Sequence, residues 1–135
     1  MNYFLVKADP DHDYSIDDLE RDSTTIWDGV HNFAAIGFIK QMKPGDKVFV
    51  YHSGKQKAVV GLAEVADTPF ENKADPRPSW AVELRYLKHF DKPLTLQEIK
   101  AQPSLKDFKL VRESRLSVMP LTNEALSFFK ERQIA

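Results

Sequence analysis

The chain has 135 residues, no cysteine and a formal net charge of −1 at pH 7. This length fits a single core, so we expect one domain over residues 1–135. The near-neutral charge excludes a global field that draws the protein onto nucleic acid or membrane, so any polyanion binding requires a local patch. The lack of thiols excludes disulfides, thiolate catalysis and cysteine-ligated zinc.

Signals for export or membrane insertion do not stand out in the sequence. The first residues lack the basic start of a signal peptide, and no stretch approaches the ~20 apolar residues of a membrane span. We therefore expect a cytoplasmic protein with no membrane partner.

The amino-terminal part predicts a strand and then a capped helix. Residues 3–7 are aromatic and β-branched, which favours a short strand. Ser15 can cap a helix over residues 15–21. Acidic side chains crowd residues 9–22, and this predicts either a surface that repels phosphate or simply a well-solvated helix.

A polar segment and a second helix come next. Residues 23–31 predict a polar loop that carries one large aromatic side chain, Trp27. Asn32 can cap the following helix, whose apolar face ends before the turn at residues 43–46.

Two apolar runs predict the centre of a sheet. Residues 47–53 and 58–65 are rich in β-branched side chains and are separated by a segment containing Gly54, so we expect a buried hairpin. The first run ends in residues 51–53, a Tyr-His-Ser sequence. Polar side chains where a core strand meets a loop indicate the edge of a pocket or merely the end of a strand.

The carboxyl-terminal half predicts shorter elements. Residues 69–78 hold prolines and mixed charge and predict a surface loop. Residues 80–87 alternate apolar and polar side chains and predict a strand that ends by Pro93. The remaining expected elements are a helix capped by Thr95, short strands at 110–111 and 116–119, and a last helix over 123–132 capped by Thr122. This order indicates an α+β fold, a small barrel of mostly antiparallel strands with helices at its margins.

The sequence contains no catalytic or metal-binding motif with a recognisable spacing. The four histidines are not paired as metal ligands, and no glycine-rich phosphate loop occurs, so we expect no metal and no cofactor. A hydrolase can still be built from Ser53, with His31 reaching it as base and Asp28 orienting the imidazole. His52 does not serve Ser53, because adjacent side chains on a strand point to opposite faces.

A binding site fits these residues better than a catalytic one. Trp27 can stack on a planar ligand, and base–aromatic stacking is worth roughly 1–3 kcal/mol. Asn32 and Ser53 can read the polar edge of such a ligand, since amides and hydroxyls both donate and accept hydrogen bonds. The alternative is that Trp27 is a core residue that covers one end of the sheet.

Lysines provide a basic counterpart to the acidic helix. If the ligand belongs to a nucleic acid, the candidates for contact with its backbone are Lys40, Lys43, Lys55 and Lys57. The alternative is that these lysines are ordinary solvated surface residues.

Several motifs, taken together, resemble one known family. They are Lys7-Ala8-Asp9-Pro10, Trp27-Asp28-Gly29-Val30-His31-Asn32, Lys43-Pro44-Gly45-Asp46, Tyr51-His52-Ser53 and Arg115-Leu116-Ser117-Val118-Met119-Pro120. In this order and spacing they resemble the EVE domain, which is similar to PUA domains and to the YTH readers of methylated adenine in RNA. The resemblance implies a PUA-like pseudobarrel that reads modified bases.

The resemblance also implies which residues form the pocket. Its members are Lys7, Trp27, Asn32, Tyr51, His52 and Ser53, with Arg115, Leu116 and Ser117 along the rim. The chain departs from the commoner family pattern at four residues, which are Ala8, Asp9, His31 and Met119. Its ligand preference can therefore differ from that of close relatives.

We predict a domain that binds a nucleic acid carrying a modified base and is not an enzyme. The expected ligand is a modified cytosine in DNA, flipped from the stack, and modified RNA is the runner-up. A hydrolase that uses Ser53 and His31 is a competing hypothesis from a different class. A protein-interaction module that uses the loop at residues 69–78 is another.

Overall fold

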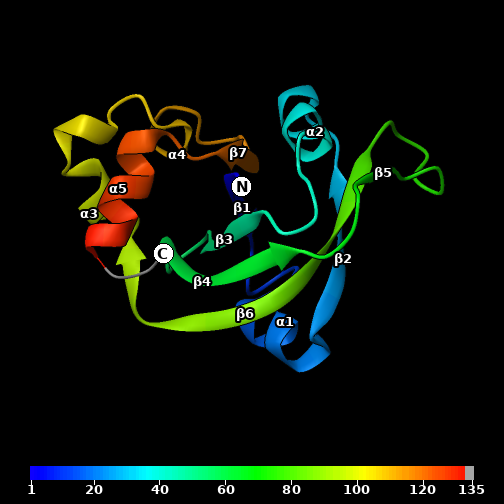
Figure 1. Ribbon diagram of the computed structural model, residues 1–135, viewed down its shortest axis with the longest axis horizontal. Helices are drawn as coiled ribbons and strands as arrows, with labels where there is room; N and C mark the ends of the chain where they lie inside the picture. Colours follow the sequence, from blue (N-terminus) through cyan, green and yellow to red (C-terminus); the bar gives the residue numbers. More distant parts are fainter. Residues whose placement is uncertain (133–135) are drawn as a thin grey trace.

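The computed structural model describes residues 1–132, which form one mixed sheet and its covering helices (Figure 1). The strands are β1 (Tyr3–Ala8), β2 (Thr24–Val30), β3 (Lys47–His52), β4 (Ala58–Val65), β5 (Phe70–Glu71), β6 (Trp80–Thr95) and β7 (Val118–Pro120). The helices are α1 (Ile16–Asp22), α2 (Phe33–Lys40), α3 (Leu96–Lys100), α4 (Lys109–Arg112) and α5 (Asn123–Glu131), with a 3-10 turn η1 at Pro103–Leu105. No helix among these residues is long and apolar enough to cross a membrane.

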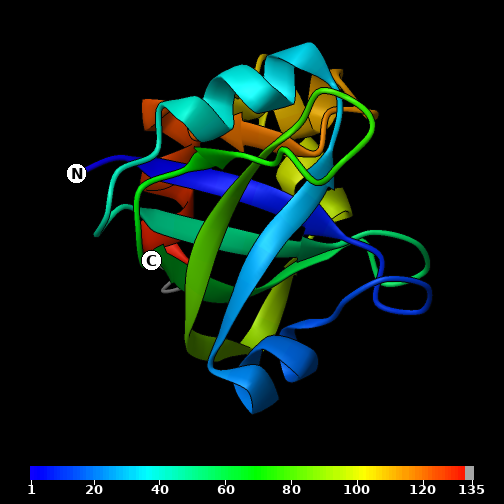
Figure 2. The ribbon, with the colours of Figure 1, turned by 90° about the vertical axis from the view of Figure 1, so that its right-hand side faces the viewer.

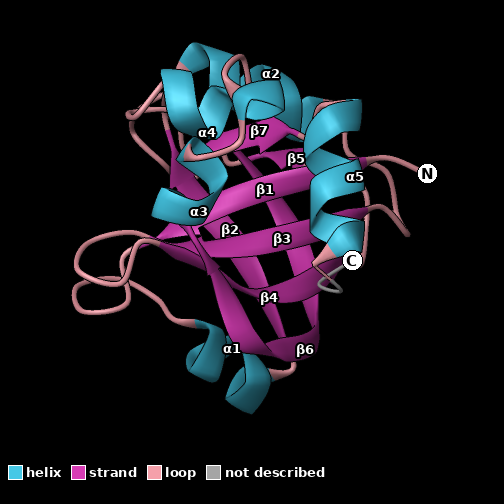
Figure 3. Ribbon diagram, turned by 90° about the vertical axis from the view of Figure 1, so that its left-hand side faces the viewer, coloured by secondary structure: helices cyan, strands magenta, loops and turns pink. Residues whose placement is uncertain are grey.

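The sheet curls into a half-barrel. Its strand order is β2-β6-β4-β3-β1-β7, with β5 added beside β6. Only the β1–β3 pair is parallel among the strand pairs of residues 1–132. Figure 3 shows α2, α3, α4 and α5 gathered on the side of β7, and α1 apart from them next to β6. The predicted α+β pseudobarrel of mostly antiparallel strands is confirmed.

The hairpin of β3 and β4 forms the centre of the core, as the sequence predicts. Phe49 is fully buried in β3, and its ring meets Phe129 of α5 edge-on with 4.9 Å between centroids. In β4, a side chain at Gly61 has no room, since a Cβ atom there would lie 2.7 Å from both Ile16 and the carbonyl of Lys88. Glycine therefore lets α1 and β6 approach β4 closely.

Three sequence predictions about elements are wrong. The segment at residues 23–31 is not a loop, because β2 pairs with β6 from Thr24 to Val30. The strand at residue 80 does not stop by Pro93 but continues to Thr95. Proline is tolerated there because β4 lies on one side of that part of β6 and β2 pairs only with its beginning.

The third wrong prediction concerns the segment before β7. Residues 110–111 are not a strand, because they lie in α4, where Leu110 points into the core. Two apolar residues in a row fit one turn of helix as well as a strand, and the packing decides between them. The caps at Ser15, Asn32, Thr95 and Thr122 are confirmed, since each side chain accepts a backbone N–H of its helix.

Candidate nucleic-acid interface

The carboxyl end of β1 brings together residues from three parts of the chain. Lys7 pairs with Tyr51 of β3, and its amide donates to the carbonyl of Ser117 at 2.9 Å. Ser53 donates twice to the carbonyl of Ala8, from its amide at 2.9 Å and from its hydroxyl at 3.2 Å. Four of the predicted pocket residues, Lys7, Tyr51, Ser53 and Ser117, therefore lie around one strand end.

The ammonium group of Lys7 faces the loop before β7. Its Nζ donates to the carbonyl of Ser114 at 2.9 Å and lies 5.9 Å from the ring centroid of Tyr51. Partial burial lowers the pKa of Lys7, and burial raises the pKa of Tyr51. Tyr51 is itself only 4% exposed. Lys7 thus lies beside the strand end, and the buried ring of Tyr51 lies next to its ammonium group.

His52 connects α1 to the sheet. It is 5% exposed, and its Nε2 accepts the amide proton of Ile16 at 3.0 Å. Its Nδ1 lies 2.8 Å from Oε1 of Gln56, and because Nε2 is an acceptor, Nδ1 carries the proton and donates. Both ring nitrogens are therefore occupied within the protein, and a ligand role for His52 stays a prediction.

Trp27 borders a hollow on one side of the β1 end. The half-buried indole meets Tyr14 edge-on, with 6.0 Å between ring centroids. The hollow has a volume of about 190 Å³ and is lined by Asp13, Tyr14, Thr25, Ile26, Trp27 and Asp28. We call it the tryptophan hollow. Because Tyr14 also donates its amide to the carbonyl of Asp9, the hollow adjoins the loop that leaves β1.

A second groove, which reaches Lys7 of β1 through Ser114, contains Asn32. It has a volume of about 330 Å³ and is lined by Asn32, Ala34, Arg112, Glu113, Ser114, Arg115 and Leu116. We call it the arginine groove. Asn32 accepts the amide proton of Ala35 through Oδ1 at 3.1 Å, which leaves its amide NH₂ free to donate to a ligand. Arg115 is exposed and Leu116 is buried.

Of the predicted pocket residues, Trp27 lines the tryptophan hollow, and Asn32, Arg115 and Leu116 line the arginine groove. The other predicted residues line neither of these hollows; they are Lys7, Tyr51, His52, Ser53 and Ser117. Figure 2 shows α2 above β1 and β2, and α1 below them. Sequence reasoning missed Tyr14 and Asp13, which no motif marks. Their position becomes apparent only once the loop after β1 folds back toward β2.

The hydrolase hypothesis requires Ser53 and His31 to meet. The structure gives each a different partner: Ser53 donates to Ala8, whereas Nε2 of His31 lies 2.6 Å from Oδ2 of Asp75. Among the hydrogen bonds of residues 1–132, none joins Ser53 to a histidine. The proposed nucleophile and base are therefore not in contact.

Asp75 organises the loop that the sequence marked for partner contacts. It accepts hydrogen bonds from the amide of Arg77 at 2.9 Å and the hydroxyl of Ser79 at 3.0 Å, in addition to its contact with His31. The Arg77 amide, followed by His31, lowers the pKa of Asp75. The loop is consequently fastened to His31, which precedes the capping residue of α2.

The four lysines predicted to contact the backbone separate into two pairs. Lys55 and Lys57 are exposed in the β3–β4 loop, which begins next to Ser53. Lys40 ends α2, where its Nζ lies 4.9 Å from the ring centroid of Trp80, and Lys43 follows. An eight-residue helix is about 12 Å long, so this second pair lies at the far end of α2 from Asn32. Their contact with a nucleic acid stays a prediction.

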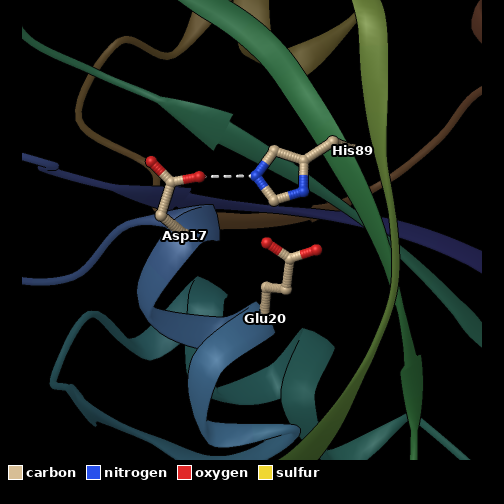
Figure 4. A group of neighbouring side chains, drawn as sticks. All are labelled: Asp17, Glu20 and His89. Carbon is tan, nitrogen blue, oxygen red and sulfur yellow. Dashed lines mark hydrogen bonds and ion pairs between the residues drawn. The ribbon is translucent and has the colours of Figure 1, made fainter.

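A group with metal-ligand chemistry lies between α1 and β6 (Figure 4). Ligand atoms of Asp17, Glu20 and His89 lie within 4.8 Å of one another. The sequence did not reveal this group because His89 comes from a distant strand. His89 contacts Asp17 at 2.6 Å, and the hydroxyl of Tyr86 lies 2.7 Å from His89 and 3.2 Å from Glu20. These contacts fasten α1 to β6, and the predicted absence of metal stays a prediction.

Comparisons with known proteins agree with the motifs. The family model of the EVE domain matches residues 2–131. Thymocyte nuclear protein 1 of Rattus norvegicus is 34% identical over an alignment of 162 positions, gaps included. The alignment covers 94% of this chain and 71% of the relative. The protein of the same name from Mus musculus is 33% identical, with the same coverage.

Solved structures share the fold over nearly the whole chain. A protein from Pseudomonas syringae is similar with a TM-score of 0.88 and 32% identity, covering 97% of this chain and 99% of that one. Human THYN1, solved in complex with 5-methylcytosine containing DNA, has a TM-score of 0.87 and 25% identity, covering 100% of this chain and 99% of that one. The motifs, the fold and these similarities agree, and the chain belongs to the EVE domain family.

Proposed function

We propose that this protein binds DNA that contains a modified cytosine, and that it holds the flipped base in the tryptophan hollow. The observation that carries the proposal is the similarity to human THYN1, whose structure contains 5-methylcytosine DNA and covers the full length of this chain. 5-Methylcytosine is accordingly the first ligand to test.

The side chains of the hollow suit a cytosine. The half-buried indole of Trp27 offers a face for stacking, which is worth roughly 1–3 kcal/mol per base. The carboxylates of Asp13 and Asp28 line the same hollow, and carboxylate oxygens accept hydrogen bonds from the N4 amino group of cytosine. Stacking and this pairing offset the few kcal/mol that base extrusion costs.

The arginine groove suits the phosphate backbone. Arg112 and Arg115 line it, and the ammonium of Lys7 lies at the neighbouring carbonyl of Ser114. Phosphate contacts fix the orientation of a protein on DNA but carry no sequence information. The acidic residues at 9–22 repel phosphate, so the strand runs over the arginine groove and away from α1.

Modified RNA, with the same base chemistry, is the alternative ligand. The 2′-hydroxyl distinguishes RNA from DNA. Tighter binding of modified RNA than of modified DNA would favour this alternative. The hydrolase hypothesis is weakened by the separate partners of Ser53 and His31. A cytoplasmic location stays a prediction.

The test is a binding panel with Trp27→Ala. The parent protein is titrated with matched DNA and RNA oligonucleotides that carry cytosine or 5-methylcytosine, at a stated salt concentration. We expect the parent to prefer the modified DNA and Trp27→Ala to bind it about 10- to 100-fold more weakly, as loss of a stacking platform predicts.

Trp80→Ala is the matched control, because Trp80 is the second tryptophan of the chain and lies under Lys40. It should retain binding if it retains its fold, which a thermal melt checks. Equal affinity of Trp27→Ala and the parent for the modified DNA would contradict the proposal.

A further inference from the structure

Phe33 is the most exposed aromatic side chain in residues 1–132. It is 83% exposed, whereas Phe70 is 43% exposed, and Ile26 of β2 is 45% exposed. Phe33 occupies the first position of α2, directly after the capping residue Asn32. The cap fixes the start of the helix, so the ring is held out from the surface by a rigid element.

The surroundings of Phe33 match those of a nucleic acid. Its two chain neighbours, Asn32 and Ala34, both line the arginine groove. Two arginines line that groove. Arg112 pairs with the carboxylate of Asp107, whereas Arg115 is exposed and takes part in none of the ion pairs of residues 1–132. An exposed aromatic ring beside such a cation fits a partner that presents phosphates and apolar faces together.

A short segment of the chain also connects Phe33 to the hollow proposed for the base. The chain from Trp27 to Phe33 spans at most about 20 Å, and β2 carries it directly from the hollow to α2. When a base is extruded, its neighbours lose a stacking partner. Proteins that open DNA commonly insert an apolar side chain such as Phe between base steps.

We propose that Phe33 inserts into the DNA duplex at the step opened by the flipped base. This inference rests on the proposed function and adds a residue to it: Trp27 binds the extruded base, while Phe33 stabilises the duplex left behind. The DNA duplex is the partner that covers the exposed ring.

The test compares Phe33→Ala with the parent on two probes. One is a short duplex with a single 5-methylcytosine, and the other is the same modified strand alone. We expect Phe33→Ala to bind the duplex about tenfold more weakly, because the unstacked step is no longer filled. Binding of the single strand should not change, since no duplex has to be opened.

Phe70→Ala is the matched control, because Phe70 is an exposed phenylalanine on β5 and not on α2. It should bind both probes as the parent does, and Phe33→Leu should retain part of the duplex affinity. Unchanged duplex binding by Phe33→Ala, or an equal loss on both probes, would overturn this inference and leave the base site intact. A parent that binds neither probe overturns the proposed function itself.

Discussion

The two hollows beside the end of β1 differ in chemistry although they share a support. The tryptophan hollow combines aromatic rings with the carboxylates of Asp13 and Asp28. The arginine groove combines an amide with Arg112 and Arg115 and with one carboxylate, Glu113, which pairs with Lys109. An acidic aromatic site suits a base with an amino group, and a basic groove suits phosphate. The proposed DNA binding is compatible with a net charge of −1, because acidic and basic side chains gather in separate hollows.

The packing of α1 and β6 against β4, which lies outside both hollows, can be disturbed at Gly61. We expect Gly61→Ala to destabilise the protein by about 3 kcal/mol, because the new Cβ meets a backbone carbonyl and Ile16 at 2.7 Å. Denaturant unfolding measures the change. Gly37→Ala is the control, since a Cβ there has nothing within 4 Å. Equal stability of the two variants would contradict the close approach of α1 and β6.

The acidic hollow should discriminate 5-methylcytosine from thymine. The two bases have the same methyl group, but thymine presents a carbonyl oxygen where cytosine presents its amino group. We expect Asp28→Asn or Asp13→Asn to reduce the preference for 5-methylcytosine by about 2 kcal/mol, because an amide also donates to thymine. Competition binding measures it. An unchanged preference in both variants would mean that the base is recognised outside this hollow.

The arginine groove should contribute affinity without base selectivity. We expect Arg115→Ala to lower DNA affinity by about 1 kcal/mol and to reduce the slope of log affinity against log salt by about 1. The affinities for modified and unmodified DNA should fall by the same factor. Arg21→Ala is the control, because Arg21 is paired with Asp18 and Asp22 on α1. A loss of affinity for modified DNA alone would contradict the assignment of phosphate contacts to the arginine groove and base contacts to the tryptophan hollow.

The loop fastened to His31 should show the smallest effect. Hydrogen bonds lower the folded-state pKa of Asp75 below its usual 3.8. Its contribution is therefore present above about pH 4 and is lost as the pH falls through the folded pKa. We expect the protection factor of the Asn72 amide, which donates to the carbonyl of Ser79, to fall at acidic pH in the parent. Asp75→Asn should show no such fall, and identical pH dependences of the protection factor would contradict this role.

Local signals predicted much of the fold. The hairpin of residues 47–53 and 58–65 was recognisable because β-branched runs flank a glycine, and caps such as Asn32 were recognisable because their side chains act within one turn. The sequence did not predict β2, because Gly29 and the polar residues around Trp27 are typical of a loop. Pairing with β6 makes that segment a strand, and such long-range pairing overrides local propensity.

The candidate site divides in the same way. The sequence by itself determined the family motifs and the capped start of α2, and it marked Trp27 as a candidate, since these depend on residue identity and short spacing. Only the tertiary structure decided that His52 anchors α1, that Asp13 and Tyr14 border the indole, and that Asn32 belongs to a separate groove with Arg115. The physical reason is that burial and partners are set by contacts between distant segments, which spacing along the chain does not encode.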